Sequence, residues 1–180
     1  MRVIAGEARG TRLARPAGGT RPVSDRAREG LFSSLGQLVR GARCLDLFAG
    51  TGAVGIEALS RGAKSAEFVD DSVAAVRVIK ENLRRTGLED RARVVKADAG
   101  RFLKRPGEPY ELVFADPPYA ATAGPLREVL SAAGTRLVPE GILVLTRGSR
   151  SSMDVIPVNF GIVRRLSYGD TVVLVCREER

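Results

Sequence analysis

The 180-residue sequence has no histidine. This absence excludes a histidine general base, a Ser-His-Asp triad and a histidine-ligated metal. There are only two cysteines, Cys44 and Cys176. They lie in β-like runs without the spacing of a metal site, so we expect buried free thiols in a reducing cytoplasm. No apolar run approaches the roughly 20 residues of a membrane span, and the arginine-rich start lacks the apolar core of a secretory signal. These absences predict a cytoplasmic protein that uses neither a membrane nor a metal.

Positive charge is concentrated at the beginning of the chain. The formal net charge is +8, and residues 1–43 hold nine arginines against three acidic residues, which leaves an excess of +6 in that segment. Guanidinium groups pair bidentately with phosphate. A concentrated arginine excess therefore favours a nucleic-acid partner over a basic surface that is merely solvated.

The order of the apolar runs predicts one α/β domain. After residue 41, strand-like and helix-like runs alternate, with strands expected at 43–48, 66–70, 92–96, 111–115 and 141–146 and helices at 53–61, 72–86, 99–104 and 124–133. Such alternation predicts a parallel sheet with helices on both faces. Residues 159–168 and 170–177 flank a turn and predict a C-terminal antiparallel hairpin. Residues 2–5 and 11–14 predict a small N-terminal β-hairpin, and Ser24 or Asp25 is expected to cap a short helix after it.

The stretch Asp116-Pro-Pro-Tyr119 follows an apolar, strand-like run. Asp116 can accept a hydrogen bond from an exocyclic amine, and the prolines remove backbone donors while leaving carbonyl acceptors such as that of Pro117. Tyr119 offers a flat face on which a flipped base can stack. A purely structural proline-rich turn would use the same residue types, so the interpretation depends on a second motif.

That second motif is a glycine-rich loop after the first predicted strand, with Gly50, Gly52 and Gly55. Glycine permits tight turns and close approach of a ligand. With Asp70 following at twenty residues, the spacing also fits a dinucleotide fingerprint. However, Asp46 lies within the strand before the loop. A carboxylate there would repel a pyrophosphate but tolerate a cationic sulfonium.

These motifs carry a resemblance to a known family. The segment Asp46-Leu-Phe-Ala-Gly-Thr-Gly52 resembles motif I of the class I S-adenosylmethionine-dependent methyltransferases, and Asp116-Pro-Pro-Tyr119 resembles their amino-methylating motif IV. Residues 2–13 and 21–32 resemble the RsmD family of 16S ribosomal RNA guanine-N2 methyltransferases, and the similarity covers essentially the whole chain. It implies a Rossmann-like, mostly parallel seven-stranded sheet. It also implies methyl transfer from S-adenosylmethionine to the N2 amine of a guanine, at position 966 of 16S ribosomal RNA in the family.

The resemblance and the strand-end positions together assign the site. Asp116, Pro117 and Tyr119 are expected to hold the target base. The cofactor is expected to meet Gly50 and Gly52 with its methionine part, with Asp46 near its ammonium and Phe48 beside the loop. Its ribose is assigned to Asp70 and its adenine amine to Asp98, for which a helix N-cap is the alternative. Asp71 is expected to face solvent or to cap the next helix. The family often has an acid near the end of the fifth strand, where this chain has Thr146-Arg147-Gly148.

The chain is expected to divide into an RNA-docking segment and a methyltransferase domain. Residues 1–22 should form an arginine-rich hairpin and loop that contributes little to the sheet core, with Arg9, Arg12, Arg15 and Arg21 on phosphates. Residues 23–180 should form the methyltransferase domain. The expected partner is 16S ribosomal RNA, within a small subunit or an assembly particle, bound by a monomer. Three alternatives stay open: a DNA adenine-N6 or cytosine-N4 methyltransferase, a non-catalytic RNA-binding assembly factor, and an NAD-binding oxidoreductase.

Overall fold

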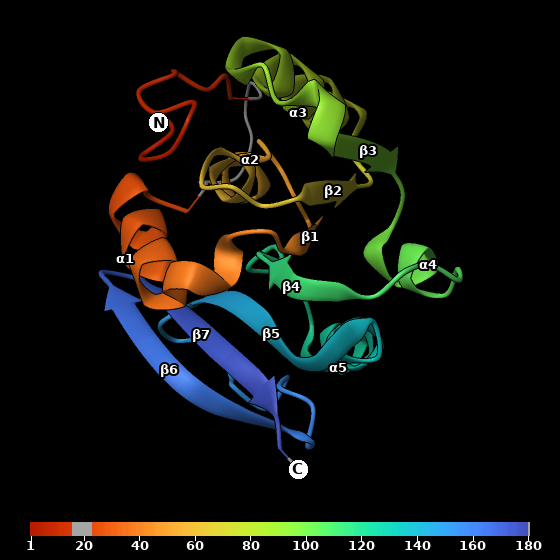
Figure 1. Ribbon diagram of the computed structural model, residues 1–180. Helices are drawn as coiled ribbons and strands as arrows, with labels where there is room; N and C mark the ends of the chain where they lie inside the picture. The colour runs from red at the N-terminus through yellow and green to blue at the C-terminus, as the bar shows by residue number, and fades with distance from the viewer. Residues whose placement is uncertain (16–22, 180) are drawn as a thin grey trace.

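The computed structural model describes residues 1–15 and 23–179. Its strands form one sheet: β1 (Arg43–Leu47), β2 (Ser65–Asp70), β3 (Ala92–Lys96), β4 (Tyr110–Ala115), β5 (Leu137–Gly148), β6 (Phe160–Tyr168) and β7 (Thr171–Glu178). They lie side by side in the order β3-β2-β1-β4-β5-β7-β6 (Figure 1). The first five pair in parallel, and β7 runs antiparallel between β5 and β6. The predicted sheet and its antiparallel C-terminal hairpin are confirmed.

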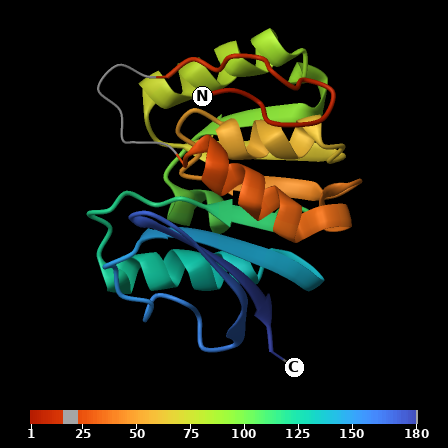
Figure 2. The ribbon, with the colours of Figure 1, turned by 90° about the vertical axis from the view of Figure 1, so that its left-hand side faces the viewer.

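Helices cover both faces of this sheet (Figures 1 and 2). On one face lie α1 (Asp25–Leu35), α2 (Ala53–Ser60) and α3 (Val73–Thr86), and on the other lie α4 (Ala99–Leu103) and α5 (Ala123–Gly134). Within the described residues, two 3₁₀ turns, Gly36–Val39 and Glu89–Arg91, complete the elements. Because side chains alternate along a strand, each strand feeds two cores. Leu112 and Phe114 of β4 enter the first core, and Val113 enters the second.

The strand order reverses beside β1, since β2 follows on one side and β4 on the other. In open α/β sheets, ligands bind at such a switch point, beyond the carboxyl ends of the strands. The carboxyl ends of β1, β2, β3 and β4 all meet at this edge because the four strands are parallel. The fold therefore gathers there the residues that follow each strand.

Several predicted strand boundaries differ from the structure, and two of them lie at the carboxyl edge of the sheet. β1 ends at Leu47 because Phe48 takes a positive φ of 56°, which leaves the extended conformation. β5 continues to Gly148 because β7 pairs with it as far as the Gly148–Thr171 partners. Both cysteines are buried free thiols, as predicted, and burial raises the pKa of Cys176 to about 11. In the described part of the chain, no helix is both long and apolar enough to cross a membrane.

The N-terminal segment is a hairpin-like strap rather than a regular two-stranded ribbon. Arg2 and Arg12 form one isolated antiparallel bridge, supported by a 3.0 Å hydrogen bond from Val3 N to the Thr11 carbonyl. The expectation that this segment contributes little to the core is wrong. Val3, Ala8 and Leu13 are all buried in the core that also contains α1, α2 and α3, and Figure 2 shows the segment lying along α2 and α3.

Buried polar groups of the helices hold this strap in place. The Glu57 carboxylate is inaccessible to solvent and accepts the backbone N–H groups of Ile4 at 2.9 Å and Ala5 at 3.0 Å. Asn82, equally buried, accepts Ala14 N at 2.7 Å and donates to the carbonyls of Ala14 and Thr51. One amide side chain therefore joins the end of the strap to the glycine-rich loop.

Candidate cofactor and base pocket

A cavity of about 1040 Å³ lies at the carboxyl edge of the sheet. Small-molecule pockets measure roughly 300–1,000 Å³, so this one has room for a cofactor and part of a second ligand. Most of the predicted site residues line it, namely Asp46, Phe48, Gly50, Asp70, Asp98, Asp116, Pro117 and Tyr119. Site residues spread between positions 46 and 119 of the sequence thus line one cavity.

The glycine-rich loop divides its glycines between the cavity and the protein interior. Gly50 lines the cavity with φ 57°, and a Cβ built there would meet only the Phe48 carbonyl, at 3.9 Å. Gly52 is not among the lining residues, and a Cβ there would lie 3.3 Å from Ile79 and Phe68. Close ligand approach therefore explains Gly50, while Gly52 is required by packing and by its left-handed φ of 74°. Thr51 and Ala53 on either side of Gly52 do line the cavity, and a contact of Gly52 with the cofactor stays a prediction.

Phe48 turns the chain from β1 into this loop in a left-handed conformation, φ 56°. Such a backbone is costly for a residue with a bulky side chain and persists where the surroundings enforce it. The next residue, Ala49, donates its N–H to the Val69 carbonyl of β2 at 3.1 Å, which ties the loop to the neighbouring strand. Phe48 itself is half-buried and lines the cavity.

Asp46 lies in β1, and its buried carboxylate reaches the first turn of α2. Its Oδ2 accepts the N–H of Gly55 at 3.0 Å, and only 3% of the residue is exposed. Neighbouring helix donors are also engaged: Gly52 N donates to the Ala49 carbonyl at 2.7 Å and Ala53 N to Thr51 Oγ1 at 3.3 Å. In a dinucleotide fold, the helix N-terminus would offer such donors to the pyrophosphate. Here the protein's own acceptors occupy them.

Asp70 ends β2 and braces the loop. Its Oδ2 accepts Gly50 N and its Oδ1 accepts Ser72 N, both at 2.9 Å. A carboxylate oxygen can accept more than one hydrogen bond, so both oxygens keep capacity for ribose hydroxyls. Asp71 is exposed, as expected, but the cap of α3 is Ser72, whose side chain accepts Ala75 N at 3.3 Å.

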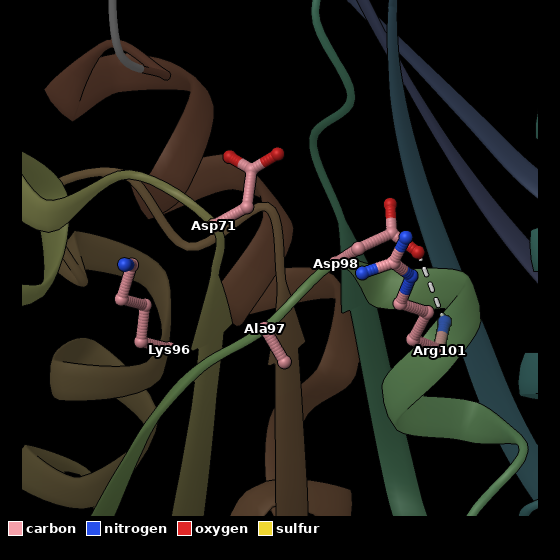
Figure 3. Close-up of a pocket in the computed structure, with 5 residues that line it drawn as sticks. All are labelled: Asp71, Lys96, Ala97, Asp98 and Arg101. Carbon is pink, nitrogen blue, oxygen red and sulfur yellow. Dashed lines mark hydrogen bonds between the residues drawn. The ribbon is translucent and has the colours of Figure 1, made fainter.

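Asp98 follows β3 and begins α4 (Figure 3). The N-cap alternative is confirmed, because Asp98 Oδ1 accepts Arg101 N at 2.9 Å. The side chain is exposed and lines the cavity together with Ala97 and Asp71. Its second oxygen has no hydrogen-bond partner in the described part of the chain, which leaves an acceptor free for an amine. The cap and the adenine assignment are therefore compatible.

The electrostatics of the cavity favour a cation. Burial, together with the nearby Asp116 and Asp70 carboxylates, raises the pKa of Asp46 well above its usual range. In residues 1–15 and 23–179, no ion pair neutralises any of the carboxylates of Asp46, Asp70, Asp98 and Asp116. Like charges held together without counterions are stabilised by a cationic ligand and repelled by an anionic one. A sulfonium with an α-ammonium fits this site, and a pyrophosphate does not.

Asp116 follows β4 directly and is partly buried. Burial raises its pKa to about 7, so near neutrality it is poised between carboxylate and carboxylic acid. Pro117 is buried behind it, whereas Tyr119 is 60% exposed. A Cβ on Gly148 would lie 2.8 Å from Tyr119 Cε1, which places the ring against the end of β5. The Cδ1–Cε1 side of the ring is thus supported, while much of the ring stays accessible.

The wall beyond Tyr119 comes from residues that the sequence did not identify as functional. Thr146 lines the cavity, whereas the buried Arg147 does not. Ser149, Arg150 and Ser151 after β5 also line it, as does the β6–β7 turn from Tyr168 to Thr171. The turn was visible in the sequence as a hairpin. The turn lies at the carboxyl edge of the sheet because β6 runs parallel to β5. No local sequence pattern indicates that orientation.

Three of the four predicted RNA-binding arginines can be placed in the structure, and none of these three lines the cavity. Arg9, Arg12 and Arg15 are carried on the strap and are not among the residues that line the pocket. Arg21 lies outside the described residues. By contrast, Arg28 of α1 is completely buried, and its Nη2 donates to the Arg2 carbonyl and pairs with Asp25 at 2.9 Å. The arginines of the strap are therefore presented on an anchored backbone.

Comparisons with known proteins fit this geometry. The family model described as Conserved hypothetical protein 95 matches residues 1–177. The chain belongs to this family. The Ribosomal RNA small subunit methyltransferase D of Escherichia coli (strain K12) is 34% identical over 182 residues, covering 99% of this chain and 90% of the relative. The predicted membership of the RsmD family is confirmed.

Solved structures of relatives share the whole fold. The structure of yhhF from Escherichia coli matches with a TM-score of 0.85 and 34% identity, over 99% of this chain and 98% of that one. A hypothetical protein from Thermus thermophilus matches with a TM-score of 0.83 and 37% identity, over 100% and 99% of the two chains. The family's class I methyltransferase fold therefore extends over this entire chain, N-terminal strap included.

Proposed function

We propose that the protein transfers a methyl group from S-adenosylmethionine to the N2 amine of a guanine in 16S ribosomal RNA. One observation carries the proposal: Asp116, Pro117 and Tyr119 open into the same cavity as the glycine-rich loop and its unneutralised carboxylates. Groups that can accept hydrogen bonds from an amine and carboxylates that favour a cation thus line the same cavity. The relatives' name adds small-subunit ribosomal RNA as the substrate class.

The protein's main task is alignment. When bound, S-adenosylmethionine supplies an electrophilic methyl group and its own leaving group. Asp70 would hold the ribose and Asp98 the adenine amine. Gly50, which has no side chain, would let the methionine part approach the backbone. Asp46 would lie near the ammonium of the cofactor, and it fixes the start of α2 by accepting the N–H of Gly55. Fixing two reactants in this way is a large source of rate acceleration.

At the acceptor end, Asp116 and the Pro117 carbonyl would accept the two N–H groups of the guanine amine. The nitrogen lone pair then faces the methyl group, and Tyr119 stacks on the flipped base. Once the nitrogen has gained the methyl group, it becomes acidic and loses a proton. A carboxylate with a pKa of about 7 can receive that proton. No histidine is required.

The alternatives are less well supported. A DNA amine methyltransferase would use the same clamp, but it needs further segments to read a base sequence. The N-terminal strap, whose Val3, Ala8 and Leu13 are buried in the core, offers arginines for phosphate contacts and little for base readout. A non-catalytic assembly factor would not need an aspartate poised near neutrality beside a cofactor loop. An NAD-dependent oxidoreductase is disfavoured because acceptors of the protein occupy the donors at the start of α2.

The RNA would dock on the N-terminal strap. We propose that residues 1–22 bind phosphates through Arg9, Arg12, Arg15 and Arg21, and that residues 23–180 carry out the chemistry as a monomer in the cytoplasm. Arginines on a fixed backbone suit the phosphate backbone of a folded RNA.

A substrate panel tests the proposal. Labelled S-adenosylmethionine is offered with small ribosomal subunits, naked 16S ribosomal RNA or double-stranded DNA, the RNAs coming from cells that lack this enzyme. We expect transfer to a ribosomal substrate that depends on Asp116. Transfer only to DNA would support the DNA alternative, and cofactor binding without transfer to any substrate would support the assembly factor.

A further inference from the structure

The β6–β7 turn brings a second carboxylate to the base end of the cavity. Asp170 occupies this turn and lines the same space as Asp116. Strands β5 and β6 both pair antiparallel with β7, which makes β6 parallel to β5, so the turn lies at the carboxyl edge. The other lining carboxylates belong to the cofactor side, within or just after β1, β2 and β3.

Contacts connect the turn to the base clamp. Tyr119 packs against Gly148, where a Cβ would approach its Cε1 to 2.8 Å. Gly148 pairs with Thr171 across the β5–β7 ladder, and Asp170 precedes Thr171. In addition, Ser149 N donates to the Asp170 carbonyl at 2.8 Å. The stacking surface, the end of β5 and the turn are therefore direct neighbours.

The turn also rests on a firm support. The Tyr168 side chain packs so closely on α1 that a Cβ at Gly30 would lie 1.6 Å from its hydroxyl. Further along β6, Arg164 Nη1 donates to Ser34 Oγ of α1 at 3.2 Å. The Asp170 side chain itself is exposed, and within the described ranges no hydrogen bond or ion pair engages its carboxylate. A fixed backbone thus presents a free acceptor.

The chemistry of guanine calls for two neighbouring acceptors. Its Watson–Crick edge places the N1–H donor beside the two donors of the N2 amine. Adenine instead places an N1 acceptor beside its N6 amine. A single carboxylate that grips an amine cannot separate these bases. A second carboxylate that meets N1 can, since it bonds to guanine and is repelled by the adenine nitrogen.

We propose that Asp170 is a specificity-determining residue that accepts the N1–H of the target guanine while Asp116 holds its N2 amine. This inference rests on the proposed function. It explains how a clamp suited to any exocyclic amine selects guanine. The role lies in substrate discrimination, so Asp170 should contribute little to cofactor binding.

A modified target nucleotide tests the assignment. Small subunits are assembled with 16S ribosomal RNA that carries either guanine or 2-aminopurine at the methylated position. 2-Aminopurine keeps the amine but has an acceptor at N1. The ratio of kcat/KM for the two substrates is measured for the wild type, for Asp170→Asn and for Asp90→Asn. The last variant removes an exposed carboxylate near the amino end of β3 and is a matched control.

We expect the wild type and Asp90→Asn to prefer guanine by roughly tenfold to a hundredfold, the range of a good base-reading contact. Asp170→Asn should reduce this preference to within a few-fold, because an asparagine can donate to the 2-aminopurine N1 or accept from guanine. An unchanged ratio in Asp170→Asn would overturn the role of Asp170. Absence of N2 methylation by the wild type on guanine would instead overturn the proposed function, so the two failures are distinguishable.

Discussion

Replacing Asp116 by asparagine should stabilise the protein at alkaline pH and remove most of its activity. Burial raises the pKa of Asp116 from 3.8 to about 7. The folded state therefore binds this proton more tightly than the unfolded state between pH 4 and 7, and the free energy of unfolding falls as the pH rises through that window. Above pH 7 the full penalty of the buried charge is present. Asparagine has nearly the same shape and carries no charge.

The magnitude follows from the size of the shift. Three pKa units correspond to about 4 kcal/mol, at 1.36 kcal/mol per unit. Because Asp116 is partly exposed, solvent screening reduces this to about 2 kcal/mol. In a protein of this length that amounts to a rise in Tm of about 4–8 °C. At pH 5 the folded carboxyl is protonated but the unfolded one has already ionised, so only about 1.2 of the roughly 3.2 pKa units count, and the advantage of the variant should be less than half of that at pH 8.

Scanning calorimetry at pH 5 and pH 8 without cofactor measures the stability change, and Asp90→Asn provides a control for loss of an exposed charge. Methyl transfer at pH 8 should fall on the order of a hundredfold in Asp116→Asn. The carboxylate can only accept a hydrogen bond from the guanine amine, whereas the asparagine NH₂ can face that amine donor to donor. A variant equally stabilised at both pH values, or one with wild-type turnover, would refute the reasoning.

Four further predictions concern the cofactor loop and the strap. Asp70→Ala should weaken S-adenosylhomocysteine binding at least tenfold in calorimetry and leave RNA affinity unchanged, because it removes the ribose acceptor and the brace on Gly50. Replacing Arg9, Arg12 and Arg15 by alanine together should preserve cofactor binding and flatten the salt dependence of RNA binding by up to about three units; deleting the strap should instead lower the Tm sharply, because Val3 and Leu13 are buried. Gly55→Ala should destabilise the fold by about 1–3 kcal/mol in urea unfolding, since its Cβ would lie 2.4 Å from Phe68, and an unchanged midpoint would contradict this packing.

The sequence was most informative about functional residues that directly follow a strand. Asp70, Asp98 and Asp116 could be placed at one edge because parallel strands bring their carboxyl ends together. The parallel sheet and the C-terminal hairpin followed from alternation and turn residues. The packing of Gly52 against Ile79 and Phe68 could not be predicted. A glycine that leaves room for a ligand and a glycine that leaves room for a neighbouring side chain have the same local sequence pattern.

The anchoring of the N-terminal strap was beyond prediction for a physical reason. Glu57 and Asn82 are polar residues on helices and would ordinarily face solvent. Their partners lie 52 to 68 residues away in the sequence, so only the tertiary structure shows that they satisfy the strap's backbone. The arginine excess drew attention to the surface of this segment, while its apolar residues at positions 3, 8 and 13 enter the core.

The most direct test of the central claim is the identity of the methylated nucleoside. Small subunits from cells lacking the enzyme are treated with the purified protein and S-adenosylmethionine, and the 16S ribosomal RNA is digested to nucleosides and analysed by mass spectrometry. We expect one new N2-methylguanosine per subunit, lost in Asp116→Asn. N6-methyladenosine, or methylation at a ring nitrogen or a ribose, would contradict it.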